Sequence, residues 1–233
     1  MTQGDLLGLV FSYVYAFSLL LLIEAIRRWR NYPTDFTRKF VHIGAGMWIW
    51  GILLLFDHWW LAIIPIATFI IFNAIFLRYH IFSAMDPKEG ATPGTVYFAF
   101  SCTLLLFLFH EGWEQQQTGF LRGYEYLAMS GIMAMTWGDA FSAIIGKRFG
   151  KHTYQIIKNR TLSIEGSIAG FVFTFAAVAI TLHIMTPISL SLAFIGALAA
   201  AILATALEAI SPAGTDNLSV PIGVALLLFL LGI

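Results

Sequence analysis

Long apolar runs separated by short charged loops constrain this chain more than any other feature of its sequence. Each run is about 17 to 22 residues long, the length that a helix needs to cross roughly 30 Å of hydrocarbon. Lipid offers no partners to backbone polar groups, so such runs cross a membrane as helices. Of the 233 residues, 59% are hydrophobic and 11% are charged, which excludes an ordinary soluble globular domain.

The pattern predicts an all-α, polytopic transmembrane bundle of about eight spans (seven to nine), forming a single domain over residues 1–233. The start of the chain lacks the basic segment and cleavage site of a secretory signal. We therefore expect the first run to remain as a span. The predicted spans are Leu6–Ile26, Val41–Phe56, Trp59–Leu77, Gly94–His110, Tyr124–Ile145, Ile164–His183, Ile188–Ile210 and Leu218–Leu231.

The distribution of Lys and Arg gives an independent test of this layout. Twelve of the 13 fall in odd-numbered loops, and only Arg122 falls on the other side. By the positive-inside rule the odd-numbered loops face the cytosol, so both termini should lie on the outer side. We expect an integral protein of the cell or inner membrane with its chemistry on the cytosolic face. The twelve are Arg27, Arg28, Arg30, Arg38, Lys39, Arg78, Lys88, Lys147, Arg148, Lys151, Lys158 and Arg160.

Two acidic residues at the cytosolic ends of spans are candidates for function. Asp139 lies about 10 Å inside the end of the fifth span. A carboxylate at that depth is costly unless it faces a cavity or a partner, and an ion pair with a neighbouring helix is the structural alternative. Glu165 opens the sixth span. There, capping by Ser163 and a favourable helix dipole explain a first-turn Glu equally well.

Four carboxylates in total lie at this edge of the bundle, because Glu208 ends the seventh span and Asp216 precedes the eighth. Together with the basic loops they predict a site for Mg²⁺ and a triphosphate. Oxygen ligands suit the metal, and Lys and Arg neutralise phosphate charge. The alternative for the basic loops is attraction to anionic lipid.

Several common site motifs are absent. Gly138 and Gly146–Lys147 are too far apart for a Walker A loop, and Arg148 stands where that motif has a hydroxyl. A Rossmann fingerprint, a zinc-ligand pattern and a G-x-S-x-G elbow are also missing. The single cysteine, Cys102, lies within an apolar run, so we expect it to be a packing residue.

Four blocks resemble the family of membrane-bound phytol kinases, dolichol kinases and CTP-dependent diacylglycerol kinases, which is distantly similar to CDP-diacylglycerol synthases. A weaker fifth block is G-T-V-Y-F, from Gly94. The four are R-K-F-V-H (Arg38–His42), G-D-A-F-S-A-I-I-G-K-R-F-G-K-H (Gly138–His152), S-I-E-G-S (Ser163–Ser167) and E-A-I-S-P-A-G-T-D-N-L-S-V-P (Glu208–Pro221).

The resemblance implies transfer of the terminal phosphoryl group of CTP to the hydroxyl of a membrane lipid. One departure from the family pattern concerns Leu162, which stands where a basic residue usually precedes the Ser or Thr of the third block. Arg160, three residues before Ser163, is expected to take over that phosphate contact. The residues that match the family's motif positions are Asp139, Lys147, Lys151, Glu165, Glu208, Asp216 and Asn217.

The leading hypothesis is a CTP- and Mg²⁺-dependent kinase of an isoprenoid alcohol: phytol, farnesol, geranylgeraniol or a polyprenol. Either Asp139 or Glu165 would receive the alcohol proton, and the sequence leaves this open. The expected metal ligands are Asp139, Glu165, Glu208 and Asp216. The expected nucleotide-binding residues are Arg38, Lys39, His42, Lys147, Arg148, Lys151, Arg160, Ser163 and Asn217.

Other functions remain open at this stage. A CTP-dependent diacylglycerol kinase or a CDP-lipid-forming cytidylyltransferase would use the same residue types. A lipid transporter or scaffold would use the basic face for anionic head groups. The expected partners are a lipid alcohol, a nucleoside triphosphate and membrane lipids, with no nucleic acid, and a homodimer is left open.

Overall fold

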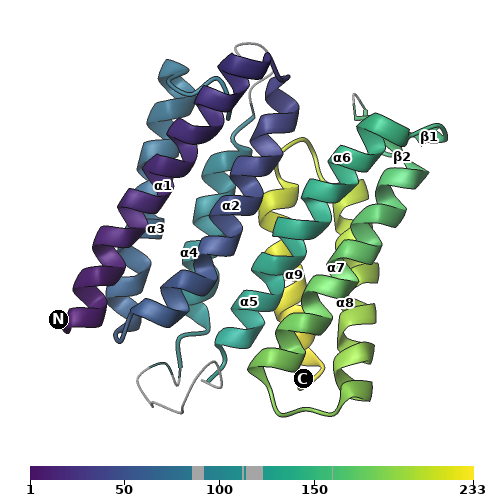
Figure 1. The fold of residues 1–233 in the computed structure, drawn as a ribbon. Coiled ribbons are helices and arrows are strands. Elements are labelled where there is room, and N and C mark those ends of the chain that lie inside the picture. The colour runs from purple at the N-terminus through teal and green to yellow at the C-terminus, as the bar shows by residue number, and fades with distance from the viewer. Residues whose placement is uncertain (86–91, 112, 114–122, 159) are drawn as a thin grey trace.

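The computed structural model describes residues 1–85, 92–111, 113, 123–158 and 160–233. Helices dominate it, and they lie side by side as a bundle (Figure 1). Lys88 and Arg122, which entered the charge analysis, lie outside the described residues. The helices are α1 (Gln3–Arg30), α2 (Thr34–Leu55), α3 (Trp59–Tyr79), α4 (Gly94–Leu108), α5 (Glu125–Met133), η1 (Ala134–Asp139), α6 (Ala140–Phe149), α7 (Ile164–Met185), α8 (Leu190–Ile210) and α9 (Asp216–Leu230).

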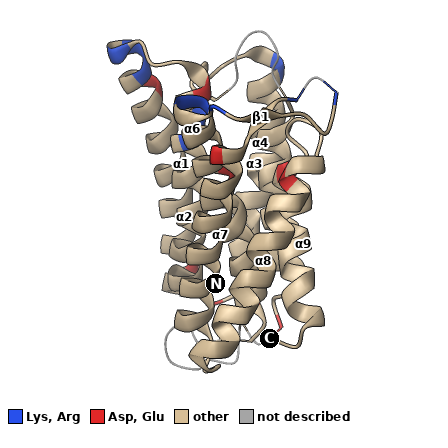
Figure 2. Ribbon diagram, turned by 90° about the vertical axis from the view of Figure 1, so that its right-hand side faces the viewer, with Lys and Arg blue, Asp and Glu red and all other residues tan. Residues whose placement is uncertain are grey.

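A helical membrane bundle is thus confirmed. Each predicted span coincides with a helix, and α5, η1 and α6 together form the fifth. Within the described part of the chain, five helical segments are long and apolar enough to cross a membrane, whereas α4 and α9 are shorter apolar helices of 15 residues. Lys and Arg gather at the end of the bundle opposite both termini (Figure 2).

Local signals in the sequence explain where the helices begin and end. Thr2 and Asp5 form a capping box at the start of α1, and Asn31 ends that helix in the left-handed conformation. Ser163 caps α7 by accepting a hydrogen bond from the backbone N–H of Gly166 at 3.1 Å. The helix α2 begins at Thr34, seven residues before the predicted span, which places the R-K-F-V-H block on regular helix.

A short antiparallel pair of strands, β1 (Thr153–Tyr154) and β2 (Leu162–Ser163), accompanies the helices. It lies between α6 and α7 at the basic end of the bundle (Figures 1 and 2). The pairing leads directly into the Ser163 cap, so the hairpin fixes where α7 starts.

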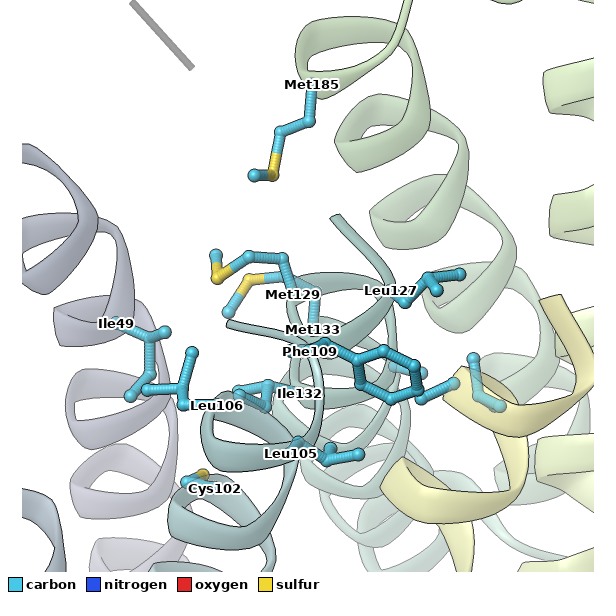
Figure 3. Packing of buried hydrophobic residues seen from close by; sticks show 14 of the residues in the cluster. Ile49, Cys102, Leu105, Leu106, Phe109, Leu127, Met129, Ile132, Met133 and Met185 are labelled. Atoms are coloured by element: carbon cyan, nitrogen blue, oxygen red, sulfur yellow. The ribbon is translucent and has the colours of Figure 1, made fainter. Parts of the chain in front are cut away.

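The apolar core lies between α4, α5, α9 and their neighbours. Met129, Met133 and Ile132 on α5 meet Leu105 and Leu106 on α4 (Figure 3). The prediction for Cys102 is confirmed, because it is a free, fully buried thiol within this cluster.

Glycines set the close approach of α5 to α9. A Cβ added at Gly131 would lie 2.2 Å from the backbone oxygen of Pro221 on α9. Backbone cannot move aside as a flexible side chain can, so only glycine allows this contact. The contact matters for function because the helices that it joins lead to Asp139 and Asp216.

We predict that Gly131→Ala destabilises the protein by about 1–3 kcal/mol, because the added methyl forces α5 and α9 apart. The measurement is thermal or denaturant unfolding in detergent micelles. A matched control is Gly223→Ala on α9, where the added Cβ meets only the flexible end of Leu207. Equal stability of the two variants would contradict the role given to Gly131.

Candidate active site

A single turn of π-helix, η1, positions Asp139. In a π-helix each hydrogen bond spans one residue more than in an α-helix, and two carbonyl oxygens of this turn also accept hydrogen bonds from side chains. His42 Nε2 on α2 donates to the carbonyl oxygen of Met135 at 3.1 Å. Thr174 Oγ1 on α7 donates to the carbonyl oxygen of Ala134 at 3.5 Å. Side chains from two other helices therefore hold the turn in place.

The carboxylate of Asp139 is paired with Lys39 of α2. Lys39 Nζ lies 2.8 and 2.7 Å from the two carboxylate oxygens, and His42 Nε2 lies 3.6 Å from one of them. Lys39 and His42 are three residues apart, so they share one face of α2. Asp139 is 8% exposed. The pair thus places opposite charges inside the bundle.

Two more carboxylates approach the same region from α8 and α9. Glu208 accepts a hydrogen bond of 2.6 Å from Ser142 Oγ on α6. Asp216 accepts one of 2.7 Å from Arg160, which also donates to the carbonyl oxygen of Ser211. Arg160 therefore ties the segment before α7 to the turn between α8 and α9.

These groups line one pocket at the basic end, which we call the charged pocket. Five basic and four acidic side chains line it, a near balance that suits a ligand carrying both phosphate and a metal ion. Asp35 pairs with Lys147 at its rim. The residues predicted from the sequence that line the charged pocket are Arg38, Lys39, Asp139, Lys147, Arg148, Arg160, Ser163, Glu208, Asp216 and Asn217.

The structure brings three of the four predicted carboxylates, those of Asp139, Glu208 and Asp216, to the charged pocket. Glu165 does not line the charged pocket, and its carboxylate accepts a hydrogen bond of 2.7 Å from the exposed His152. Ser163 and Gly166 are the α7 residues that face the pocket, and Glu165 lies between them on another face. Lys151 is exposed on the loop after α6 and does not line the pocket either.

A second space, which we call the apolar cavity, lies between α1, α2, α3 and α4. Its walls are mostly aliphatic and aromatic, and His42 is one of the polar residues that also line it. Gly94 lies at its charged end, where a Cβ would lie 2.5 Å from Arg38 Nη2 and 3.1 Å from Asn217 Nδ2. The apolar cavity and the charged pocket have four lining residues in common, namely Arg38, Lys39, Asp139 and Asn217.

Asn73 and Thr95 are among the polar residues of the apolar cavity that were not predicted. Asn73 Nδ2 on α3 donates to the carbonyl oxygen of Thr95 on α4 at 2.9 Å, which joins the two helices near the charged end. The signal that could have revealed Asn73 is an amide within an otherwise apolar span. Thr95 Oγ1 is buried and has no hydrogen-bond partner within the described part of the chain.

The described residues contain no group of three acidic, His or Cys side chains close enough to hold a metal ion as they stand. Asp139 and Asp216 are each engaged by a cation instead, namely Lys39 and Arg160. Asn217 also lines the charged pocket, and its Oδ1 atom is buried and has no hydrogen-bond partner among the described residues.

This arrangement defines a class: a helical membrane protein in which a pocket for a charged ligand opens onto a cavity for an apolar one. The sequence is 31% identical over 226 residues to a phytol kinase of Synechocystis sp., which covers 94% of this chain and 88% of that protein. It is 24% identical over 235 residues to a probable chloroplastic phytol kinase of Triticum aestivum. That match covers 93% of this chain and 74% of the relative. No family model and no solved structure matches the chain.

The chain therefore belongs to the phytol kinase family. The resemblance seen in the sequence blocks is confirmed, and so is the expectation of a membrane-bound phosphotransferase.

We predict that Lys39→Met lowers the free energy of unfolding by about 3 kcal/mol, because it leaves the buried Asp139 carboxylate without its cation. Unfolding in detergent micelles measures this. Lys147→Met is the control: both side chains of the Lys147–Asp35 pair are about 60% exposed or more, so its loss should cost less than about 1 kcal/mol.

The double variant Lys39→Met/Asp139→Leu completes this test. It removes both charges, so it should recover most of the stability that the single variant loses. A double variant no more stable than Lys39→Met would show that the ion pair does not account for the effect.

Proposed function

We propose that this protein transfers the γ-phosphoryl group of CTP to the hydroxyl of a membrane isoprenoid alcohol such as phytol. One observation carries the proposal: the charged pocket and the apolar cavity meet at Arg38, Lys39, Asp139 and Asn217. A nucleotide in the first and a lipid in the second would bring the γ-phosphate and the hydroxyl together there, which is the main requirement of phosphoryl transfer. The names of the two relatives support an isoprenoid alcohol as acceptor.

The basic side chains of the charged pocket would bind the triphosphate. Lys147, Arg148 and Arg160 lie on its α6 and α7 side, and Arg38 lies where it meets the apolar cavity. Guanidinium groups suit phosphate oxygens because they donate two parallel hydrogen bonds. Lys151 lies outside this pocket, so its predicted phosphate contact would require a longer reach than that of Lys147.

The same pocket supplies donors that fit Mg²⁺. Asp139, Glu208 and Asp216 offer carboxylate oxygens, and the buried Asn217 Oδ1 lacks a hydrogen-bond partner among the described residues. We propose that these residues hold Mg²⁺ and that Lys39 and Arg160 leave their carboxylate partners to bind phosphate. The metal would neutralise charge on the β- and γ-phosphates. Glu165 would not contribute a ligand from its position beside His152.

Asp139 is the proposed acceptor of the alcohol proton. It lies at the junction of the two spaces, where a lipid hydroxyl would meet the phosphate. In the structure Lys39 donates hydrogen bonds to both carboxylate oxygens of Asp139. Asp139 would become available as a base when Lys39 turns to the phosphate. His42, fixed by the carbonyl oxygen of Met135, would keep Asp139 in place.

We propose further that the chain crosses the membrane eight times, with its basic end cytosolic and both termini outside. The gathering of Lys and Arg at one end of the bundle supports this orientation (Figure 2). A cytosolic charged pocket would be accessible to nucleotides, and the apolar cavity would lie at membrane depth.

The first test uses purified protein, phytol and CTP labelled on either the α- or the γ-phosphate. We expect γ-label in phytyl phosphate and no α-label in lipid. A cytidylyltransferase would instead transfer the α-label to a phospholipid substrate and release the γ-label in pyrophosphate. Absence of labelled lipid with phytol, diacylglycerol and polyprenol alike would exclude the kinase and favour a transporter or scaffold.

The second test addresses the proposed base. Asp139→Asn should lower kcat for phytol by at least about 100-fold, because an amide cannot accept the proton or neutralise Lys39. Asp57→Asn is the control and should retain full activity, because Asp57 lies between α2 and α3, where its carboxylate accepts a hydrogen bond from Thr2 near the N-terminus. Similar activity of the two variants would remove Asp139 from the mechanism.

The third test compares Glu165 with Asp139. We expect Glu165→Gln to change kcat by less than about threefold, because its carboxylate lies outside the charged pocket and pairs with His152, whose side chain is 74% exposed. A loss as large as that of Asp139→Asn would instead assign the proton acceptor to Glu165.

A further inference from the structure

The apolar cavity begins at the lining residues that it has in common with the charged pocket and extends along α2, so it is called the channel below. Along α2 its lining runs from Arg38 to Ile52, which corresponds to about 21 Å of helix. This is roughly two-thirds of the hydrocarbon thickness of a bilayer. A ligand inside the channel would therefore lie along the bundle with one end at Lys39 and Asp139.

The mouth of the channel carries unpaired polar atoms. Asn217 is 6% exposed, and its Oδ1 atom is buried without a hydrogen-bond partner in the part of the chain that the structure describes. Thr95 also lines the channel, and its Oγ1 atom is likewise buried without a hydrogen-bond partner among the described residues. Burying such groups unpaired is unfavourable, so both are suited to a ligand hydroxyl at this end.

Further in, the polar groups of the wall are satisfied by one another. Trp48 Nε1 donates to Ser12 Oγ at 3.0 Å, and the Tyr15 hydroxyl donates to the carbonyl oxygen of Gly44 at 2.9 Å. The rings of Tyr15 and Trp48 stack with centroids 4.4 Å apart. The interior therefore offers apolar surface and no unmet hydrogen bond from these groups, as an alkyl chain requires.

Large buried side chains line the far end of the channel. Ile52 is the lining residue farthest from Arg38 along α2, and Pro65 and Ile66 are those farthest from Asn73 along α3. Beyond them Phe56 packs flat against Gly8, where a Cβ on Gly8 would lie 2.6 Å from the ring. Large aliphatic and aromatic side chains thus form a floor between α1, α2 and α3.

A second apolar groove, formed by α2, α5, η1 and α7, is the competing location for a lipid chain. Met47, Trp137 and Ala176 are among its lining residues. It has no lining residue in common with the charged pocket, so a chain lying there would not bring its head to Asp139.

We propose that the channel holds the tail of a single-chain isoprenoid alcohol and that its floor limits the acceptor to about four isoprene units. Extended covalent chains advance by about 1.2 Å per bond, so four units of four bonds reach about 19 Å, close to the channel depth. Polyprenols are too long, and diacylglycerol carries two chains. This inference rests on the proposed function and specifies its substrate class.

The test shortens the channel. Ala45 lines it about 9 Å of helix beyond Lys39, so Ala45→Phe should block its deeper half. We expect kcat/KM for phytol to fall by at least about tenfold while that for geraniol, with two units, changes by less than about threefold. Turnover of geraniol also shows that the variant is folded. The control, Ala176→Phe, fills the second groove and should leave both values unchanged.

A second variant lengthens the channel and does not depend on the folding of the first. Ile52→Ala removes bulk from the floor. The ratio of kcat/KM for geranylfarnesol, which has five isoprene units, to that for phytol should therefore rise by about fivefold or more. Wild-type protein should use undecaprenol at least about 100-fold less well than phytol.

The outcomes separate the two proposals. One outcome is that wild-type protein has equal kcat/KM for undecaprenol and phytol, and that Ala45→Phe leaves the ratio of kcat/KM for phytol to that for geraniol unchanged. The channel is then not the site of the tail, but the kinase proposal stands. If Ala176→Phe alters chain-length preference instead, the tail lies in the second groove. If no alcohol is phosphorylated, the proposed function itself fails.

Discussion

The ion pair between Lys39 and Asp139 is the contact on which the rest of the arrangement depends. Neither charge would be tolerated alone at this depth in an apolar bundle, and pairing makes both acceptable. The pair joins α2 to the π-turn, and so connects the helices around the apolar cavity to those around the charged pocket. A protein that must bring a water-soluble donor to a lipid acceptor needs such a junction, with charges that a ligand can rearrange.

The helices could be predicted because membrane spans are specified by length and apolar composition, and every predicted segment coincides with a helix. The features that were missed are those that composition does not encode. The α2 helix continues to Thr34 through polar residues, the strands β1 and β2 form from only two residues each, and η1 differs from α-helix by one residue of hydrogen-bond register.

The candidate site was predictable in outline for a similar reason. Charged residues at one end of an apolar bundle meet because no other surface there is polar, which brings Asp139, Glu208 and Asp216 to one pocket. Which way a side chain points around its helix is a finer property. Ser163 and Gly166 turn toward the pocket while Glu165 turns toward His152, and a match to a sequence block cannot resolve that rotation.

The π-turn before Asp139 has a consequence for how this region tolerates changes in length. Each residue of a helix rotates the chain by about 100°, so deleting one residue between Met135 and Gly138 would convert the turn to α-helix and swing everything before it relative to α6. The carboxylate would keep its place in the sequence but no longer face α2. Insertions and deletions here should therefore be far more damaging than substitutions, and the spacing between α5 and α6 is as much a part of the site as the side chains it carries.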